Sequence, residues 1–201
     1  MIKVGITGGI GSGKSIVSKV LTAMNYPVYN SDIEAKRIVQ ENPKVRSQLI
    51  ELFGKELYIN NQLNRSYLAS IIFNDDVALK KVNNIIHPQV RKDFEIFCES
   101  QNKEIVFNEA AILFETGGEK QFDQMVLVTA DEDLRISRVM KRDGIKKSEV
   151  QSRIGKQWPD EKKIPLADFV VKNNGKEFLI GQVEELVNSL REVYNSSKSS
   201  K

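Results

Sequence analysis

The chain has little cysteine and no long apolar run. Cys98 is the only cysteine among 201 residues, so no intramolecular disulfide can form, and a lone thiol fits a reducing cytosol. The longest apolar run, Ala110–Phe114, is far below the ~20 residues of a membrane-spanning helix. Lys3 and Gly5 interrupt the N-terminal apolar stretch, which is too short for a signal peptide. These absences predict a soluble, cytoplasmic protein without a membrane partner.

The chain also lacks a large excess of charge of one sign. Its 30 Lys and Arg residues against 27 Asp and Glu residues give a net charge of +3, which is too small to indicate a nucleic-acid partner. Apolar residues make up 40% and charged residues 28% of the chain, the balance of an ordinary globular protein. A chain of this length buries roughly 70% of its unfolded surface. We therefore expect one domain, or one domain with large insertions.

Strand patterns alternate with helix patterns near both ends of the chain, which is typical of a parallel sheet with helices on both faces. The predicted strands cover residues 2–7, 26–29, 104–107, 125–129 and 169–171. The predicted helices follow the first strand, cover residues 131–143 and 148–158, and close the chain on a stripe of Val183, Leu186, Val187, Leu190 and Val193. The predicted fold class is α/β, in three layers.

Residues 31–100 interrupt this alternation with helical periodicity and almost no strand signal. Ser31-Asp32-Ile33-Glu34 matches a capping box that opens one helix. His87-Pro88 is expected to open another, because proline is tolerated in a first helical turn. Cys98 near the end of that helix is expected to fill the core as a small apolar side chain. We predict a helical insertion after the second strand.

A glycine-rich turn between the first strand and the first helix carries the clearest chemical signal. Gly8-Gly9-Ile10-Gly11-Ser12-Gly13-Lys14-Ser15 fits G-x-x-x-x-G-K-[ST] at every fixed position. In such a loop the backbone N–H groups and the start of the helix bind phosphate oxygens. Lys14 can reach the β and γ phosphates, and the Ser15 hydroxyl can bind Mg²⁺. The loop predicts a nucleoside triphosphate.

Other nucleotide-binding classes lack their motifs here. A dinucleotide fingerprint fails because Lys14 stands where the third glycine should be. The nearest match to the guanine-selective Asn-Lys-x-Asp, Asn102-Lys103-Glu104-Ile105, has no aspartate, and no aspartate is followed three residues later by glycine. A second motor domain would not fit in the chain. A regulatory GTPase and a nucleic-acid-dependent ATPase are therefore disfavoured against a small-molecule kinase.

Three arginines are spaced to share one face of a helix. Arg135, Arg138 and Arg142 lie three and four residues apart, and like charges so placed repel by a few tenths of a kcal/mol per pair. A polyphosphate held across that face would turn the repulsion into transition-state stabilisation. Arg153 and Gln157 extend the polar face onto the next helix. A solvated basic face is the alternative to a mobile lid.

Asp32 stands at the end of the second strand and in the first turn of a predicted helix. An acid in that position commonly compensates the helix dipole. The functional alternative is that its carboxylate accepts the proton of an attacking hydroxyl beside the phosphate loop. Position alone favours neither role.

Taken together, these elements and several others resemble one family, the dephospho-coenzyme A kinases. The resemblance runs from Ile6 to the closing helix. Besides the phosphate loop and Ser31-Asp32, it is carried by His87-Pro88-Gln89-Val90-Arg91, Ile112-Leu113-Phe114-Glu115, Arg138 to Arg142-Asp143, Arg153 with Gln157, and Ala167-Asp168 to Asn174-Gly175. The His-Pro and Leu-Phe-Glu elements are more specific than the phosphate loop, which many kinases share.

The resemblance implies a P-loop kinase fold in three parts. These are a nucleotide-binding core (residues 1–30, 101–134 and 166–201), a helical substrate-binding insertion (31–100) and a small helical lid (135–165). It implies that ATP, with Mg²⁺, phosphorylates the ribose 3′-hydroxyl of dephospho-coenzyme A. The runner-up is a related P-loop kinase that acts on a nucleoside or nucleoside monophosphate. We expect a monomer or a weak homo-oligomer.

The family's functional residues can be transferred only to matching positions. Catalytic roles are implied for Lys14, Asp32, Arg138 and Arg142. Nucleotide binding is implied for Gly9, Gly11, Ser12, Gly13, Lys14, Ser15, Ile16, Asn174 and Gly175, with Ser15 also at the metal. The acceptor side is implied for Asp32, His87, Arg91 and Glu115, although His87 before Pro88 is also read as a simple helix cap.

Two positions depart from the family's usual pattern. Asn30-Ser31-Asp32 replaces Asp-Ala-Asp, so only the second acid is kept. Glu109-Ala110-Ala111 replaces Asp-x-Pro before the Leu-Phe-Glu element. Glu109 retains an acid at that strand end, where it can support a metal through water. Neither change removes a residue that the chemistry requires.

Overall fold

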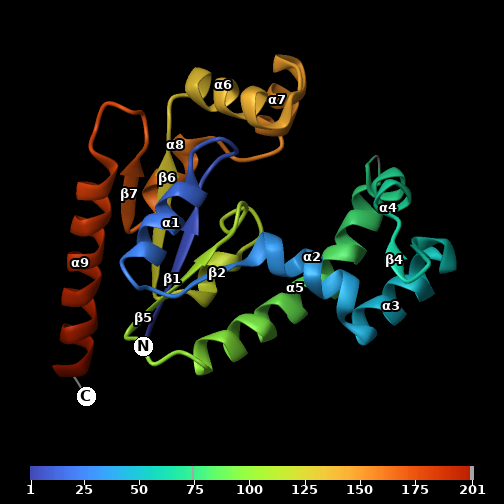
Figure 1. Cartoon of the computed structure of the whole chain (residues 1–201), viewed down its shortest axis with the longest axis horizontal. Helices are drawn as coiled ribbons and strands as arrows, with labels where there is room; N and C mark the ends of the chain where they lie inside the picture. The colour runs from blue at the N-terminus through green and yellow to red at the C-terminus, as the bar shows by residue number, and fades with distance from the viewer. Residues whose placement is uncertain (74, 200–201) are drawn as a thin grey trace. The chain divides into compact units, whose positions relative to one another are not determined.

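The computed structural model describes residues 1–73 and 75–199 of the chain (Figure 1). These residues form two compact units. The core unit comprises Met1–Tyr29 and Gln101–Lys201, and the helical unit comprises Asn30–Ser100.

The core unit is built on a five-stranded sheet in the order β2-β5-β1-β6-β7. The strands are β1 (Ile2–Thr7), β2 (Val28–Asn30), β5 (Ile105–Glu109), β6 (Gln124–Thr129) and β7 (Phe169–Lys172). The β1–β5, β1–β6 and β6–β7 pairs are parallel. The predicted parallel α/β class is confirmed, and each predicted strand is found within two residues of its expected ends.

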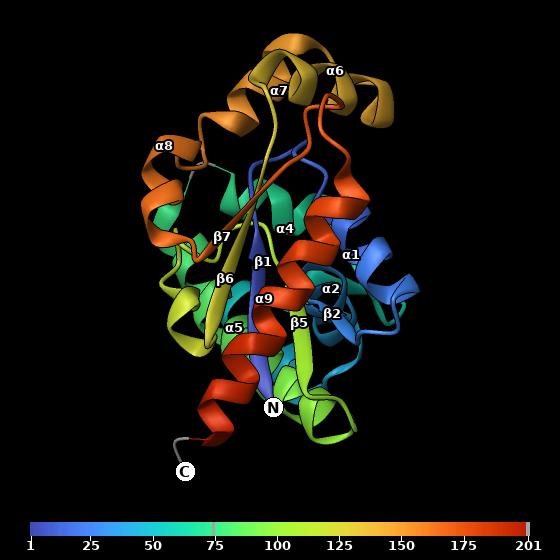
Figure 2. The ribbon, with the colours of Figure 1, turned by 90° about the vertical axis from the view of Figure 1, so that its left-hand side faces the viewer.

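One face of the sheet is covered by α1 (Lys14–Ala23) and α9 (Leu179–Ser199), as Figure 2 shows for α9 in front of the strands. Apolar residues of both helices pack there against every second residue of the strands. Val4 and Ile6 of β1, for example, are completely buried on this side. The cluster comprises Ile2, Val4, Ile6, Val17, Leu21, Ile105, Phe107, Val126, Val128, Val171, Val183, Leu186, Val187 and Leu190. This packing fixes the start of α1 against the end of β1.

The opposite face carries a smaller cluster that includes Leu113, Phe114 and Met125, with Phe122 and Trp158 packed against it. Near these residues in the chain are three short elements, η2 (Gly118–Gln121), α8 (Asp160–Lys163) and η3 (Ile164–Leu166). The helix predicted over 148–158 is shorter in the structure, α7 (Lys147–Ile154), with Gly155 as its C-terminal cap. Beyond it the N–H groups of Lys156 and Gln157 donate to the carbonyl oxygens three residues earlier, so the chain leaves the α-helix in tighter turns.

Two helices follow β6 beyond the carboxyl ends of the strands (Figure 1). α6 (Glu132–Asp143) begins after Asp131, which is in the cap position but makes no side-chain capping bond. Gly144 ends the helix in the left-handed conformation, with φ 67°. Ile136 and Val139 of α6 pack against Val150 of α7. The two helices therefore form one small apolar cluster of their own.

The helical unit contains α2 (Ser31–Glu41), α3 (Pro43–Phe53), η1 (Lys55–Leu57), β3 (Tyr58–Ile59), β4 (Gln62–Leu63), α4 (Arg65–Ile72) and α5 (Asp76–Glu99). The β3–β4 hairpin was not predicted. Asn60 and Asn61 both have positive φ, at 49° and 64°, and asparagine is one of the few residues that tolerate this conformation in a tight turn. The two consecutive asparagines were the sequence signal from which the tight turn of this hairpin could have been predicted.

Two predictions about helix starts were wrong. Asn30 caps α2, accepting a hydrogen bond from the N–H of Ile33, so the cap is one residue earlier than Ser31. Pro88 lies inside α5 and does not open a helix. A proline removes one backbone hydrogen bond, but Val82 and Val90 are buried on either side of it, so packing carries the helix through. Cys98 is buried, as predicted.

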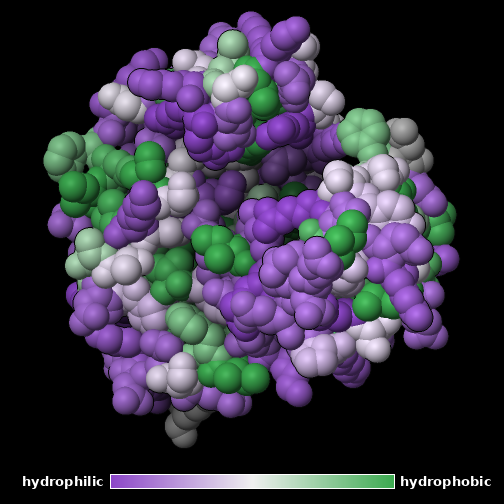
Figure 3. Space-filling view, turned by 45° about the vertical axis from the view of Figure 1, so that its right-hand side comes forward, coloured by the Kyte–Doolittle hydropathy of each residue, from purple (hydrophilic) through white to green (hydrophobic). Residues whose placement is uncertain are grey.

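Hydrophilic side chains cover most of the face shown in Figure 3, and hydrophobic residues lie in separate groups between them. Among the residues that the structure describes, no helix combines the length and the apolar character needed to cross a bilayer.

Candidate phosphate-binding site

The loop between β1 and α1 has the backbone that the sequence motif predicts. Gly11 and Gly13 adopt left-handed conformations, with φ 80° and 98°. At Gly13 an added Cβ would also lie 2.0 Å from Nδ2 of Asn173, so only glycine fits there. Gly13 is the cap position of α1 and has no side chain to satisfy the helix N-terminus. No side chain caps the N-terminus of α1, where the helix dipole favours an anion.

Side chains of the loop are arranged for a ligand. Nζ of Lys14 lies 2.7 Å from the carbonyl oxygen of Gly8 and donates to it. The buried hydroxyls of Thr7 and Ser12 have no hydrogen-bond partner among the described residues. Ser15 and Ile16 are exposed at the first turn of α1. The loop thus presents an ammonium group, hydroxyls and backbone N–H groups together, which is the donor set that a polyphosphate requires.

Arg135 of α6 lies against the phosphate loop. Its Nε donates a 3.0 Å hydrogen bond to the carbonyl oxygen of Ile10, and a Cβ at Gly9 would lie 2.1 Å from its Nη2. The Arg135 side chain is nearly buried, and its Nη1 lies 3.5 Å from Oδ2 of Asp160. Burial raises the pKa of Asp160, and the charges of Arg135 and Lys163 oppose that rise. Arg135 therefore belongs to the loop's immediate surroundings.

The other two arginines of α6 differ from each other. Nη1 of Arg138 lies 3.4 Å from the carbonyl oxygen of Gly11, and its Nη2 donates a 2.9 Å hydrogen bond to the carbonyl oxygen of Asn173. Arg142 is exposed and pairs with its neighbour Asp143 at 2.7 Å. The Arg142 guanidinium lowers the pKa of Asp143, with further contributions from Arg153. In this conformation Arg138 is at the loop and Arg142 is engaged elsewhere.

The loop after β7 also reaches the phosphate loop. Nδ2 of Asn173 donates a 2.9 Å hydrogen bond to the carbonyl oxygen of Ser12. Asn174, which the resemblance implies for nucleotide binding, accepts a hydrogen bond from the N–H of Asp131 at 3.0 Å. Gly175 follows in the left-handed conformation, with φ 75°. Asn174 and Gly175 therefore lie next to residues that contact the loop.

Glu115, which the resemblance implies on the acceptor side, is partly buried and has partners within the core unit. Its Oε1 lies 2.8 Å from Nζ of Lys163, which is fully buried. The same oxygen accepts a 3.1 Å hydrogen bond from the N–H of Trp158. The adjacent Gln157 accepts a 2.8 Å hydrogen bond from the N–H of Ile10 in the phosphate loop. Residues 157–163, which we call the tether segment, thus contact both Glu115 and the loop.

The helical unit carries the remaining predicted residues. Asp32 is the second residue of α2 and is exposed. His87 and Arg91 are one turn apart on α5. Burial lowers the pKa of His87, and the positive charge of Arg91 lowers it further. His87 lies in the middle of α5, so it does not cap a helix.

Arg135 and Gln157 were predicted only as parts of the polar face of the lid, and Asn173 and Asp160 were not predicted as site residues. The helical spacing of Arg135 with Arg138, and of Arg153 with Gln157, was the signal for the first two. Asn173 lies within the stretch from Ala167 to Gly175 that carries the resemblance, but neither its contact with Ser12 nor the contact of Asp160 with Arg135 has a local pattern, because each joins residues more than 20 positions apart.

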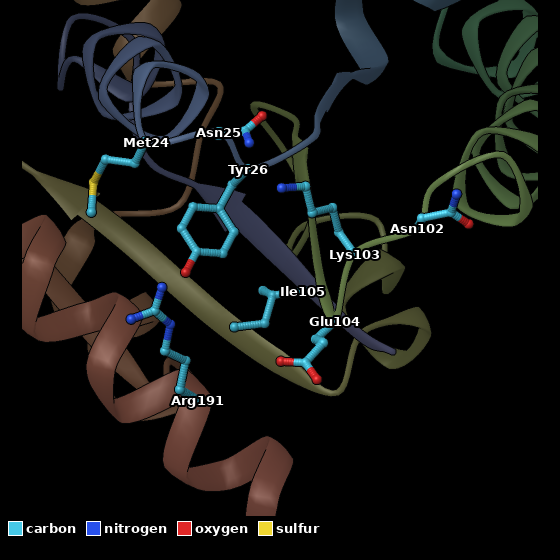
Figure 4. A pocket seen from close by; sticks show the side chains of 8 residues that line it. All are labelled: Met24, Asn25, Tyr26, Asn102, Lys103, Glu104, Ile105 and Arg191. Carbon is cyan, nitrogen blue, oxygen red and sulfur yellow. The ribbon is translucent and has the colours of Figure 1, made fainter.

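A hollow of about 220 Å³ lies at the other end of the core unit's sheet, where β5 begins (Figure 4). Its residues are Met24, Asn25, Tyr26, Asn102, Lys103, Glu104, Ile105 and Arg191. Two charged side chains of the hollow have partners. Glu104 pairs with Lys198 at 3.5 Å, and the Arg191 guanidinium lies 5.9 Å from the centre of the Tyr26 ring. The hollow lacks the glycine-rich backbone of the phosphate loop and forms no part of that site.

Comparison with known proteins gives a consistent result. The family model described as dephospho-CoA kinase matches residues 2–178. The chain is 41% identical over 187 residues to the dephospho-CoA kinase of Bacteroides fragilis, covering 92% of this chain and 91% of that one. It is 39% identical to the dephospho-CoA kinase of Porphyromonas gingivalis, covering 95% of each. A crystal structure of TT1252 from Thermus thermophilus matches with a TM-score of 0.83 and 34% identity, covering 95% of this chain and 96% of that one.

Proposed function

The chain belongs to the dephospho-CoA kinase family, and from this premise we propose that it transfers the γ-phosphoryl group of ATP to the ribose 3′-hydroxyl of dephospho-coenzyme A. The products would be coenzyme A and ADP, the last step of coenzyme A synthesis. The observation that carries the proposal is the phosphate loop, with its left-handed glycines and Lys14, in a chain that matches the family along most of its length. Nothing favours a nucleoside or nucleoside monophosphate as the acceptor.

On the nucleotide side, Lys14 would follow the γ-phosphoryl group into the transition state and balance its charge. Around the phosphates would lie the loop residues Gly9, Gly11, Ser12, Gly13, Lys14, Ser15 and Ile16. Asn174 and Gly175 would lie near the adenine. Each contact would act mainly by positioning and by electrostatic stabilisation, since phosphoryl transfer needs little covalent chemistry from the protein.

Mg²⁺ is part of the proposal. The exposed Ser15 hydroxyl at the start of α1 fits one position of a cation that prefers oxygen ligands. Within residues 1–73 and 75–199 no group of three or more His, Cys, Asp or Glu side chains could hold a metal ion. The nucleotide and water would therefore supply most of the ligands. Bound there, the ion would neutralise charge on the β and γ phosphate oxygens.

On the acceptor side, we assign Asp32 to the proton of the attacking hydroxyl, and His87 and Arg91 to substrate binding. Asp32 is exposed and acidic, as a general base must be to reach a substrate. Arg91 offers a bidentate partner for phosphate groups. The resemblance also implies Glu115 on the acceptor side, but its Oε1 is held inside the core unit by Lys163 and the Trp158 N–H, so we assign it no contact with the acceptor.

We further propose that residues 135–165 act as a lid and that Arg138 and Arg142 clamp ATP phosphates when it closes. Arg138 already contacts loop carbonyls, whereas Arg142 must leave Asp143 to do so. Arg138→Ala and Arg142→Ala should each depress kcat without unfolding the protein, because each removes a charge that stabilises the transition state. Lys141→Ala, an exposed change on the same helix, is the matched control for kcat.

Hydrogen exchange measures lid closure separately from catalysis. Exchange over residues 135–160 should slow when ATP and dephospho-coenzyme A are bound together. Unchanged exchange in a saturated ternary complex would contradict a moving lid.

The product tests the proposed reaction itself. ATP, Mg²⁺ and dephospho-coenzyme A with the purified chain should give a product whose new phosphate is on the 3′ oxygen, as phosphorus NMR distinguishes. We expect a cytoplasmic enzyme, a monomer or weak homo-oligomer that needs no nucleic acid. Size exclusion with light scattering measures the oligomeric state.

A further inference from the structure

The tether segment connects the phosphate loop to the opposite face of the core unit's sheet. At its start, Gln157 accepts the hydrogen bond of the Ile10 N–H. The N–H of the next residue, Trp158, donates to Oε1 of Glu115. At its end, Lys163 pairs with the same carboxylate oxygen. One carboxylate therefore holds the segment at two points, five residues apart.

The Glu115–Lys163 pair is costly by itself. Lys163 is 0% exposed. The attraction between two charges removed from water offsets their lost hydration only when their geometry is excellent. Apolar residues of similar volume often replace such a pair at no loss of stability. Stability alone therefore gives a weak reason for the pair. A positional role gives a stronger one, because the pair fixes the carboxylate that receives the Trp158 N–H.

The position matters because Ile10 stands inside the phosphate loop. Its carbonyl oxygen accepts from Arg135 and its N–H donates to Gln157. The backbone N–H and the carbonyl oxygen of Ile10 are thus both hydrogen-bonded to side chains from outside the loop. If the tether segment moved, Ile10 would lose one partner, and Asp160 would move away from Arg135. The loop's conformation is coupled to the segment at two places.

We propose that Glu115, fixed by Lys163, is a positioning residue that sets the phosphate loop for ATP through Trp158 and Gln157. The inference rests on the proposed ATP site. It gives Glu115 a role on the nucleotide side, through protein contacts, in place of direct contact with the acceptor.

The test is a set of variants that remove the charges together. Glu115→Leu with Lys163→Met removes the pair and the acceptor of the Trp158 N–H without leaving a buried unpaired charge. This double variant should raise KM for ATP about three- to tenfold, the scale of one lost hydrogen bond, with KM for dephospho-coenzyme A unchanged. Glu115→Gln with Lys163→Met is the matched control: it removes the charges, keeps an oxygen for Trp158 and should raise KM for ATP less.

Coupling to Gln157 separates positioning from general destabilisation. Gln157→Leu alone should raise KM for ATP by a similar factor. Added to Glu115→Leu with Lys163→Met, it should raise KM no further, because the contact with Ile10 is already lost. The proposal would be overturned if the increases in KM for ATP from Gln157→Leu and from the double variant multiplied in the combined variant. A folded double variant with the parent's KM for ATP would also overturn it.

Two readouts need no substrate, so they distinguish this inference from the proposed function. Trp158 is the only tryptophan, so its fluorescence reports the tether segment directly and should change in the double variant. The Ile10 amide should exchange faster with solvent there. If the double variant does not fold, Glu115→Asp carries the test, because it keeps the charge but shortens the side chain by one methylene. Glu115→Asp with parental Ile10 exchange and ATP KM would contradict the positioning role.

Discussion

Lys14→Ala should lower turnover by several orders of magnitude and leave the fold intact. Lys14 is the one side chain of the phosphate loop whose charge can follow the γ-phosphoryl group into the transition state. Its ammonium group now rests on the carbonyl oxygens of Gly8 and Gly9, so its loss removes no core packing. The measurement is steady-state turnover at saturating ATP and dephospho-coenzyme A, with circular dichroism as the test of folding.

Lys19→Ala is the matched control for this change. Lys19 is exposed on the same helix, α1, and lies beyond the loop. It should keep the parent's turnover. Lys14→Ala turnover within tenfold of the parent would show that the loop does not act as proposed.

Asp32→Asn should lower kcat by about 10²–10⁴-fold, the usual contribution of a general base. Asparagine keeps the shape and hydrogen-bonding capacity of the side chain but cannot accept the proton of the acceptor hydroxyl. The affinity for ATP should change little. Rapid-quench or coupled assays at saturating concentrations of both substrates give kcat.

The alternative role of Asp32, compensation of a helix dipole, has its own control. Asp76 is an exposed acid in the first turn of α5, so Asp76→Asn should cost about as much dipole stabilisation, 0.3–1 kcal/mol, without lowering kcat. If Asp32→Asn also keeps a normal kcat and only raises the acceptor KM, then Asp32 binds substrate and does not move the proton.

Local patterns predicted the parts of this fold that depend on nearby residues. β1 has the predicted bounds, because apolar residues and the glycine-rich turn define it within eight positions. The predicted helix over residues 131–143 ends where α6 ends, because the next residue, Gly144, readily adopts the positive φ that terminates a helix. The phosphate loop needs only its own glycines and the helix that follows. In each case the determining interactions are close in sequence.

Tertiary packing decided the features that sequence reasoning placed wrongly or missed. Pro88 looked like a helix start, but the buried residues before and after it extend α5 over 24 residues. Asn173 contacts Ser12 across 161 positions, and no local pattern shows such a pair. Glu115 matched the family element, yet its partner Lys163 depends on how two distant segments meet on one face of the sheet.

The acceptor distinguishes a dephospho-CoA kinase from other P-loop kinases, and a comparison of acceptors measures that specificity. ATP consumption should be measured with dephospho-coenzyme A, adenosine, AMP, uridine, pantothenate and shikimate under the same conditions. We expect dephospho-coenzyme A to exceed every other acceptor by at least about 10²-fold in kcat/KM, the scale that a few lost contacts supply. Comparable kcat/KM with AMP or a nucleoside would contradict it and leave only a P-loop kinase of another specificity.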